Sequence, residues 1–135
     1  MTKSIYTLSS IARPLEPQYP TNLAVLILLP LIGLGLAGAA YFLHDAGAAG
    51  ALSAGLGGLM AAFLAWALGR EVDPDRNAAA FIAMAITVAA VALGWSPAIW
   101  VLTLCLMATR IVVRTVGQAA RLTDLALVTA LAAMA

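Results

Sequence analysis

The chain is short of charge. Only 10% of its 135 residues are Lys, Arg, Asp or Glu, whereas 64% are hydrophobic. A soluble domain carries about 25% charged residues, so this chain has too few charges to cover a water-facing surface. Its net charge is only +1, which argues against a strongly basic face of the kind that binds nucleic acid. We therefore expect a membrane protein, in which long apolar runs take the place of a polar surface.

Reactive side chains are equally scarce. The single cysteine, Cys105, excludes an internal disulfide and a cysteine-cluster metal site. The single histidine, His44, stands beside Asp45 with no second metal ligand in view, which favours a solvated turn residue over a proton relay. Phosphate-binding Gly-x-x-x-x-Gly-Lys, His-Glu-x-x-His and Gly-x-Ser-x-Gly motifs are all missing from the sequence. We therefore predict no catalytic residue, no cofactor and no metal, and we favour a non-enzymatic role.

One polar stretch, residues 69–77, divides the apolar sequence. Five of the thirteen Lys, Arg, Asp and Glu residues fall within positions 70–76, and apolar runs long enough to cross a bilayer flank them on both sides. The stretch therefore predicts a short loop between two membrane helices. Asp73 is a suitable N-cap and Pro74 suits the first helical position, so we expect the second of these helices to begin at Asp73.

The hydropathy pattern predicts an all-α fold, a polytopic membrane helix bundle with four transmembrane helices. Spans of about 21 to 23 residues, at 1.5 Å per residue, cross a hydrocarbon layer about 30 Å thick. A further apolar run at the end reaches only about half of that layer, which predicts a short or incomplete fifth helix. Residues 1–21 are expected to form a cytoplasmic arm that lies partly in the interface, and residues 22–135 to form the bundle. The expected helices are 22–43, 46–68, 73–93, 97–117 and 123–135.

The second predicted helix, 46–68, is built from small residues at spacings of four. In lipid, helices associate through close packing, and small side chains let two backbones approach each other. We therefore expect this helix to be the most buried of the bundle, and Trp66 near its end to belong to an interfacial aromatic belt. The residues expected to carry the packing are Gly47, Gly50, Ala51, Ala54, Gly55, Gly58 and Ala62.

The basic residues predict the orientation. If the chain alternates sides across four helices, all seven Lys and Arg residues fall on one side and none on the other. Positive residues are retained in the cytoplasm, so we expect the N-terminus and the 69–77 loop to be cytoplasmic. The seven residues are Lys3, Arg13, Arg70, Arg76, Arg110, Arg114 and Arg121.

The charged residues of the cytoplasmic side are the candidate site. They can form interfacial ion pairs and reach lipid phosphates, or they can bind an anionic headgroup or a soluble partner. Because consecutive antiparallel helices are neighbours, we expect Asp73 or Asp75 to form a salt bridge with Arg110 or Arg114. The full candidate cluster is Arg70, Glu71, Asp73, Asp75, Arg76, Arg110, Arg114 and Arg121.

The stretch Arg70-Glu71-x-Asp73-Pro74-Asp75, followed later by Arg114-Thr115, resembles uncharacterised multi-spanning bacterial integral membrane proteins. The resemblance covers residues 46–135 and implies the same topology, in a bacterial inner membrane, with no particular activity.

Three function classes follow from these observations. We favour an accessory or structural subunit of a membrane complex that acts by helix packing, with the lipid bilayer and other membrane subunits or further copies of the chain as partners. The alternative is a small oligomeric transporter or channel that uses a kink at Pro30. No acid lies at the centre of the four predicted spans, which argues against proton-coupled transport. An enzyme acting on lipid headgroups is the third possibility.

Overall fold

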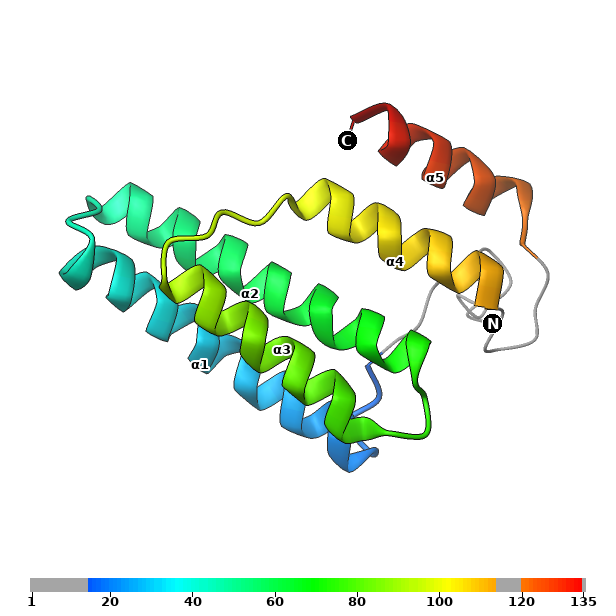
Figure 1. Cartoon of the computed structure of the whole chain (residues 1–135), viewed down its shortest axis with the longest axis horizontal. Coiled ribbons are helices and arrows are strands. Elements are labelled where there is room, and N and C mark those ends of the chain that lie inside the picture. The colour runs from blue at the N-terminus through cyan, green and yellow to red at the C-terminus, as the bar shows by residue number, and fades with distance from the viewer. Residues whose placement is uncertain (1–14, 114–119, 135) are drawn as a thin grey trace, which may run out of the picture.

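The structure is a computed structural model that describes residues 15–113 and 120–134, and it is entirely helical within them. Five helices follow one another without a strand in this part of the chain, which confirms the all-α class (Figure 1). Their bounds are α1 Pro20–Leu43, α2 Ala48–Val72, α3 Asn77–Ala92, α4 Ile99–Val113 and α5 Leu122–Met134.

Helix α2 is the centre of the arrangement. It packs against α1, α3 and α4, whereas α5 packs against α4 alone, and α1 and α3 also touch each other. Its sequence holds more buried residues than any other helix, as the small-residue pattern predicted. The buried core around it includes Val25 of α1, Ala80 and Met84 of α3 and Leu106 of α4. The chain is therefore organised as three helices around one, with α5 at the edge (Figure 1).

Glycine allows the close contacts of α2. A Cβ atom at Gly55 would lie 2.7 Å from the carbonyl oxygen of Gly33, and one at Gly69 would lie 2.7 Å from the Cα atom of Ala80. Both distances are too short for a side chain, so α1 and α3 approach α2 through its glycines.

Not all of the predicted packing residues lie in contacts between helices of this chain. Gly47 and Gly50, at the start of α2, are exposed, and Ala54 is half-buried. The buried ones are Ala51, Gly55, Gly58 and Ala62.

The predicted loop at 69–77 is shorter than expected. Helix α2 continues through Arg70 and Glu71 to Val72, and the N–H of Asp73 donates to the carbonyl of Gly69 as the C-cap of that helix. Asp73 therefore ends α2 instead of starting α3, which begins four residues later at Asn77. Pro74 is equally suited to this arrangement, because proline commonly follows a helix end.

The other four helix starts also differ from the expectation, by one or two residues, and α1 and α4 are described here. Helix α1 begins at Pro20, in the first helical position, directly after a turn in which the N–H of Tyr19 donates to the carbonyl of Glu16. Helix α4 begins at Ile99 and not at Pro97. The expected end of that helix, to residue 117, extends beyond the described residues.

The connection from α3 to α4 lets the chain change partners. Gly94 has φ of +96° and follows the C-cap Leu93, and the N–H groups of Gly94 and Trp95 donate to the carbonyls of Val91 and Ala90. This is a Schellman motif, for which glycine is the favoured residue because of its positive φ. The following residues lead α4 away from α3, and the two helices do not pack on each other. The expectation that consecutive helices are neighbours therefore fails here, because α4 packs on α2.

Two of the described helices could cross a membrane by length and composition. They are α1, with 24 residues, and α2, with 25, and only 22% of the most apolar window of α1 is buried inside the chain. At 1.5 Å per residue each reaches about 36 Å. Helices α3, α4 and α5 are apolar but shorter, with 16, 15 and 13 residues. The sequence predicted four membrane spans of 21 or more residues, but only two helices in the described part of the chain are long and apolar enough to cross a membrane.

Candidate functional site

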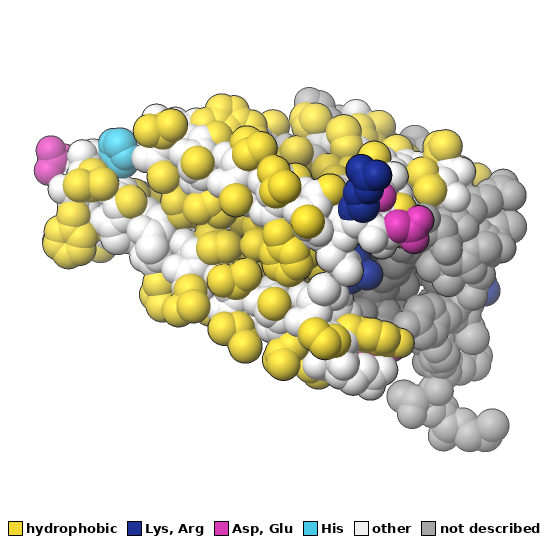
Figure 2. All heavy atoms as spheres, turned by 60° about the horizontal axis from the view of Figure 1, so that its bottom comes forward, with side chains coloured by type: hydrophobic (Ala, Val, Ile, Leu, Met, Phe, Trp, Pro, Cys, Tyr) yellow, Lys and Arg dark blue, Asp and Glu magenta, His cyan; other side chains and the backbone are white. Residues whose placement is uncertain are grey.

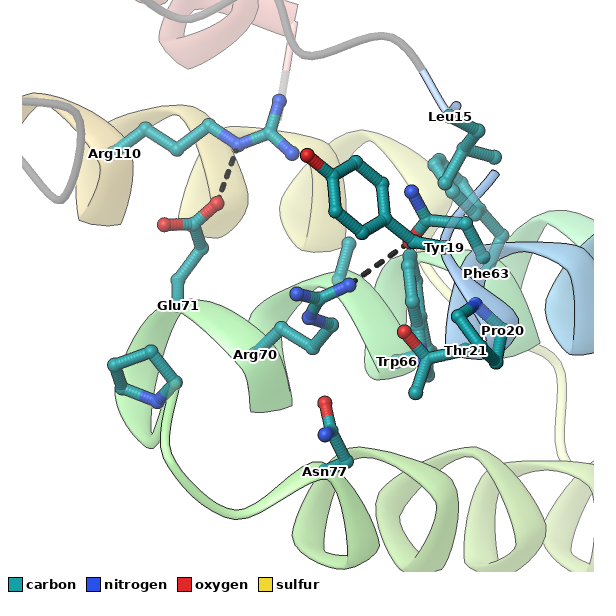
Figure 3. Close-up of a pocket in the computed structure, with 13 residues that line it drawn as sticks. Leu15, Tyr19, Pro20, Thr21, Phe63, Trp66, Arg70, Glu71, Asn77 and Arg110 are labelled. Atoms are coloured by element: carbon teal, nitrogen blue, oxygen red, sulfur yellow. Dashed lines mark hydrogen bonds and ion pairs between the residues drawn. The ribbon is translucent and has the colours of Figure 1, made fainter. Parts of the chain in front are cut away.

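Four helix ends meet at one end of the molecule and enclose a pocket of about 700 Å³ (Figure 3). The start of α1, the end of α2, the start of α3 and the end of α4 all contribute residues to its lining. At the opposite end, the Nε2 atom of His44 lies 3.2 Å from the carbonyl oxygen of Ala92, joining the ends of α1 and α3. The four helices therefore alternate in direction. The polar and aromatic residues of the described lining are Tyr19, Thr21, Asn22, Phe63, Trp66, Arg70, Glu71, Asn77 and Arg110.

The strongest polar contact in the pocket joins Glu71 to Arg110. The Nε–H of Arg110 donates to Oε1 of Glu71 over 3.0 Å, and both side chains are almost fully buried, with 11% and 3% of their areas exposed. The contact bridges α2 and α4. Because a carboxylate and a guanidinium attract each other more strongly when both are shielded from water, this pair joins the end of α4 to α2.

Arg70, the neighbour of Glu71 in the sequence, points to a different helix. One of its terminal nitrogens donates to Oδ1 of Asn22 over 2.9 Å, and the Nδ2 of Asn22 in turn donates to the carbonyl of Glu16. The guanidinium carbon of Arg70 lies 5.3 Å from the centre of the Trp66 ring, within the range of a cation–π contact. Arg70 is therefore held by a neutral amide and an aromatic face (Figure 3).

Trp66 forms the wall beneath Arg70. It is only 4% exposed, so it is a core residue and not the interfacial belt residue that the sequence predicted. Its ring packs against Phe63, with the centroids 6.1 Å apart. Its Nε1–H is buried and has no hydrogen-bond partner within the described part of the chain. Buried indole N–H groups usually find a partner, and this one has none among the residues that the structure describes.

The structure brings together only part of the predicted charged cluster. Arg70, Glu71 and Arg110 line the pocket, whereas Asp73, Asp75 and Arg76 do not. The Nε of Arg76 lies 3.9 Å from Oδ2 of Asp73, and the side chain of Arg76 is 82% exposed, so this pair belongs to the water-facing loop.

The predicted partner of Arg110 was wrong. It pairs with Glu71 and not with Asp73 or Asp75, because α4 packs on α2 and not on α3. Arg121 immediately precedes α5, and its N–H donates to Oδ2 of Asp124; Arg114 lies outside the described residues.

Sequence reasoning missed several residues of this end of the molecule. Asn22, the first residue of the predicted helix 22–43, accepts a hydrogen bond from Arg70, 48 positions away in the sequence. Asn77 was assigned to the loop and lines the pocket. Asp124 is 1% exposed and accepts the hydrogen bond that starts α5. The contact between Trp66 and Arg70 could have been predicted from their spacing, because residues four apart lie on the same face of a helix.

Metal-binding chemistry is not concentrated anywhere in the described residues. No group of three or more His, Cys, Asp or Glu side chains lies close enough there to hold an ion. Cys105 is a free, exposed cysteine on α4. The polar side-chain groups of the described pocket lining are two guanidinium groups, two amides, two hydroxyls, one indole and one paired carboxylate. This set is rich in hydrogen-bond donors.

Comparison with protein-family models, with curated proteins and with solved structures finds no match for this chain. Its function is therefore argued from its own residues.

Proposed function

We propose that this chain is an integral membrane protein that acts without catalysis, as an accessory or structural subunit of a membrane complex. In this proposal α1 to α4 cross the bilayer in alternating directions, and the α2–α3 loop faces the cytoplasm. We include the bacterial inner membrane in the proposal only because the stretch 70–75 resembles that of bacterial integral membrane proteins.

The outer surface of the helices supports a membrane location. Large apolar side chains are exposed along the middle of the helices, among them Leu31 and Leu34 of α1 and Ile82 and Ile86 of α3. In the face shown in Figure 2, hydrophobic side chains cover the stretch between the two ends, and the Lys and Arg side chains lie toward one end. An apolar belt between polar ends is the surface that a bilayer requires.

The shorter helices fit the bilayer less directly. Helices α3 and α4 reach only about 24 and 22 Å, against a hydrocarbon layer of about 30 Å. The exposed Leu93 and Trp95 continue the apolar surface beyond α3. A bilayer also thins locally around short helices at a modest cost in free energy, so this mismatch is tolerable.

An apolar groove between α1 and α2 carries the subunit proposal. It has a volume of about 330 Å³ and lies where Gly33 and Gly55 bring the two helices together. Leu34 of α1 and Leu56 of α2 form part of its lining and are both well exposed. A groove of this kind, in the middle of two spanning helices, suits a transmembrane helix of another subunit or of a second copy, because packing drives helix association in lipid. The remaining lining residues are Pro30, Ala37, Leu52 and Leu59.

The test compares two tryptophan substitutions. Leu34→Trp fills the groove, whereas Ile82→Trp adds the same bulk to an exposed position of α3 outside it. Each protein is purified in a gentle detergent, and its partners are identified by native mass spectrometry. We expect the parent chain and Ile82→Trp to retain a stoichiometric partner or a second copy, and Leu34→Trp to lose it. A monomeric parent chain, or equal retention by both variants, would contradict the proposal.

A further inference from the structure

We propose that the pocket at the charged end of the bundle binds a phosphate group, with Arg70 as the cation that recognises it. The phosphate can belong to a lipid headgroup or to a soluble compound, and the two sources are separated by the experiment below. This inference rests on the proposed membrane location, because that location places the pocket at the level of lipid phosphates.

The charges of the pocket favour an anion. Among the residues that the structure describes, two arginines and one carboxylate line it, which gives these lining residues a net charge of +1. Glu71 is hydrogen-bonded to Arg110, so its charge is compensated inside the site. Arg70 has no ion pair with a described carboxylate, and its hydrogen bond goes to the neutral amide of Asn22. The uncompensated positive charge of the pocket is therefore that of Arg70.

The donors around Arg70 match the acceptors of a phosphate. A guanidinium presents up to five N–H groups in a planar fork, and the structure shows one of them used on Asn22. Trp66 lines the pocket, and the centre of its ring lies 5.3 Å from the guanidinium carbon of Arg70, where a cation–π contact helps to hold the guanidinium in place. Asn77 contributes an amide from the start of α3. Phosphate oxygens only accept hydrogen bonds, so they suit this set better than a ligand with donors of its own.

The size and the apolar lining indicate what is attached to the phosphate. A volume of about 700 Å³ is several times larger than a bare phosphate needs, and Leu15, Phe63 and Ala67 line it beside the polar groups. The pocket therefore has room for an apolar or glycerol-like group next to the phosphate, as in a phospholipid.

Trp66 provides a direct readout of occupancy. The other two tryptophans, Trp95 and Trp100, are about half exposed and do not line the pocket. Replacing both by phenylalanine leaves Trp66 as the only tryptophan of the full-length protein. Its fluorescence in detergent solution is then followed during titration with dihexanoyl phosphatidic acid, and with dihexanoylglycerol, which has the same acyl chains without the phosphate.

We expect a saturable change with phosphatidic acid and none with dihexanoylglycerol. Arg70→Gln should weaken binding by roughly 10- to 100-fold, because hydrogen bonds from a charged donor are lost. Arg76→Gln is the matched control. It removes the same charge from an exposed position of the same end of the molecule, outside the pocket, and should leave the affinity within about twofold. Arg70→Lys keeps the charge without the planar fork and should bind with intermediate affinity.

The source of the phosphate is read from competition. Displacement of phosphatidic acid by inorganic phosphate or glycerol phosphate at similar concentrations assigns the site to soluble phosphates, and resistance to both assigns it to a lipid headgroup. Equal responses to the two lipids, no saturable response, or equal weakening by Arg70→Gln and Arg76→Gln would each overturn the inference. Circular dichroism and gel filtration verify folding, and Arg70→Lys replaces Arg70→Gln if the latter does not fold. The titration needs no partner subunit, so phosphate binding can be refuted while the proposed subunit function holds. The subunit function can likewise be refuted while phosphate binding holds.

Discussion

The buried pair between Glu71 and Arg110 makes the most direct prediction of the structure. We consider two substitutions that remove one charge each while keeping most of the side-chain volume, Glu71→Gln and Arg110→Met. Each leaves the other charge in a site where only 3% or 11% of its side chain reaches the surface. The double variant removes both charges together and leaves no charge of this pair uncompensated.

The expected magnitudes follow from the distance and the burial. At 3.0 Å and an effective dielectric constant of about 20, the attraction is about 5 kcal/mol before the cost of removing both groups from water is subtracted. Breaking a buried pair by removing one partner costs about 3–5 kcal/mol, whereas replacing both partners is often close to neutral. We therefore expect each single variant to lose about 3 kcal/mol of unfolding free energy and the double variant to lose no more than either single variant, so that the coupling is at least about 3 kcal/mol.

The assay is a double-mutant cycle with a built-in comparison. Unfolding of the full-length protein in mixed micelles is followed by circular dichroism as the fraction of SDS is raised. A second cycle on Asp73 and Arg76, 3.9 Å apart and water-facing, should give no more than about 0.5 kcal/mol. If the coupling between Glu71 and Arg110 is as small as that of the exposed pair, the two charges do not hold α4 to α2, and the reasoning above is refuted.

Three further predictions follow from the packing, the topology and the start of α5. Gly55→Ala should destabilise the protein in the same unfolding assay, because its Cβ would meet the carbonyl of Gly33. The Cβ of Gly57→Ala meets nothing within 4 Å, so this variant should stabilise α2 by up to about 1 kcal/mol. Equal effects of the two variants on stability would place both glycines toward lipid. In a background without the native cysteine, an impermeant thiol reagent added to intact cells should label Asp45→Cys but not Val72→Cys, and the opposite pattern would reverse the topology. Asp124→Ala removes the acceptor of the Arg121 N–H at the start of α5 and should lower the stability of the protein by about 0.5–2 kcal/mol. Asp124→Asn should have an intermediate effect. Unchanged thermal stability of Asp124→Ala would rule out this role.

The existence of the helices could be predicted from the sequence because hydropathy alone determines it. Apolar runs of this length have few alternatives to a helix, and the glycine-rich composition of α2 indicated correctly that other backbones approach it. The ends of the helices were harder to predict. Asp73-Pro74 fits the start of one helix and the end of another equally well, and only the hydrogen bond to Gly69 decides between them.

The partner of Arg110 could not be predicted, because it depends on where α4 packs. The stretch 93–98 between α3 and α4 is long enough for α4 to lie beside either α3 or α2, and nothing in its residues selects one of them. The continuation of α2 through Arg70 and Glu71 could not be predicted for a similar reason, because it depends on contacts with other helices. Two charged residues read as a loop when they are considered alone, yet they remain helical here because each finds a partner on another helix.

The last turn of α2 explains why the charged site lies where it does. Consecutive residues of a helix are rotated by about 100° from one another, so three in a row point in three directions. Gly69 faces Ala80 of α3, Arg70 binds Asn22 of α1, and Glu71 binds Arg110 of α4. Each neighbour of α2 is thus contacted by one residue of a single turn, and the pocket is the space that remains between them. Because the three contacts differ in kind, a close backbone approach, a neutral amide and an ion pair, only the direction toward α1 leaves a guanidinium without a carboxylate, and this is why we assign phosphate recognition to Arg70.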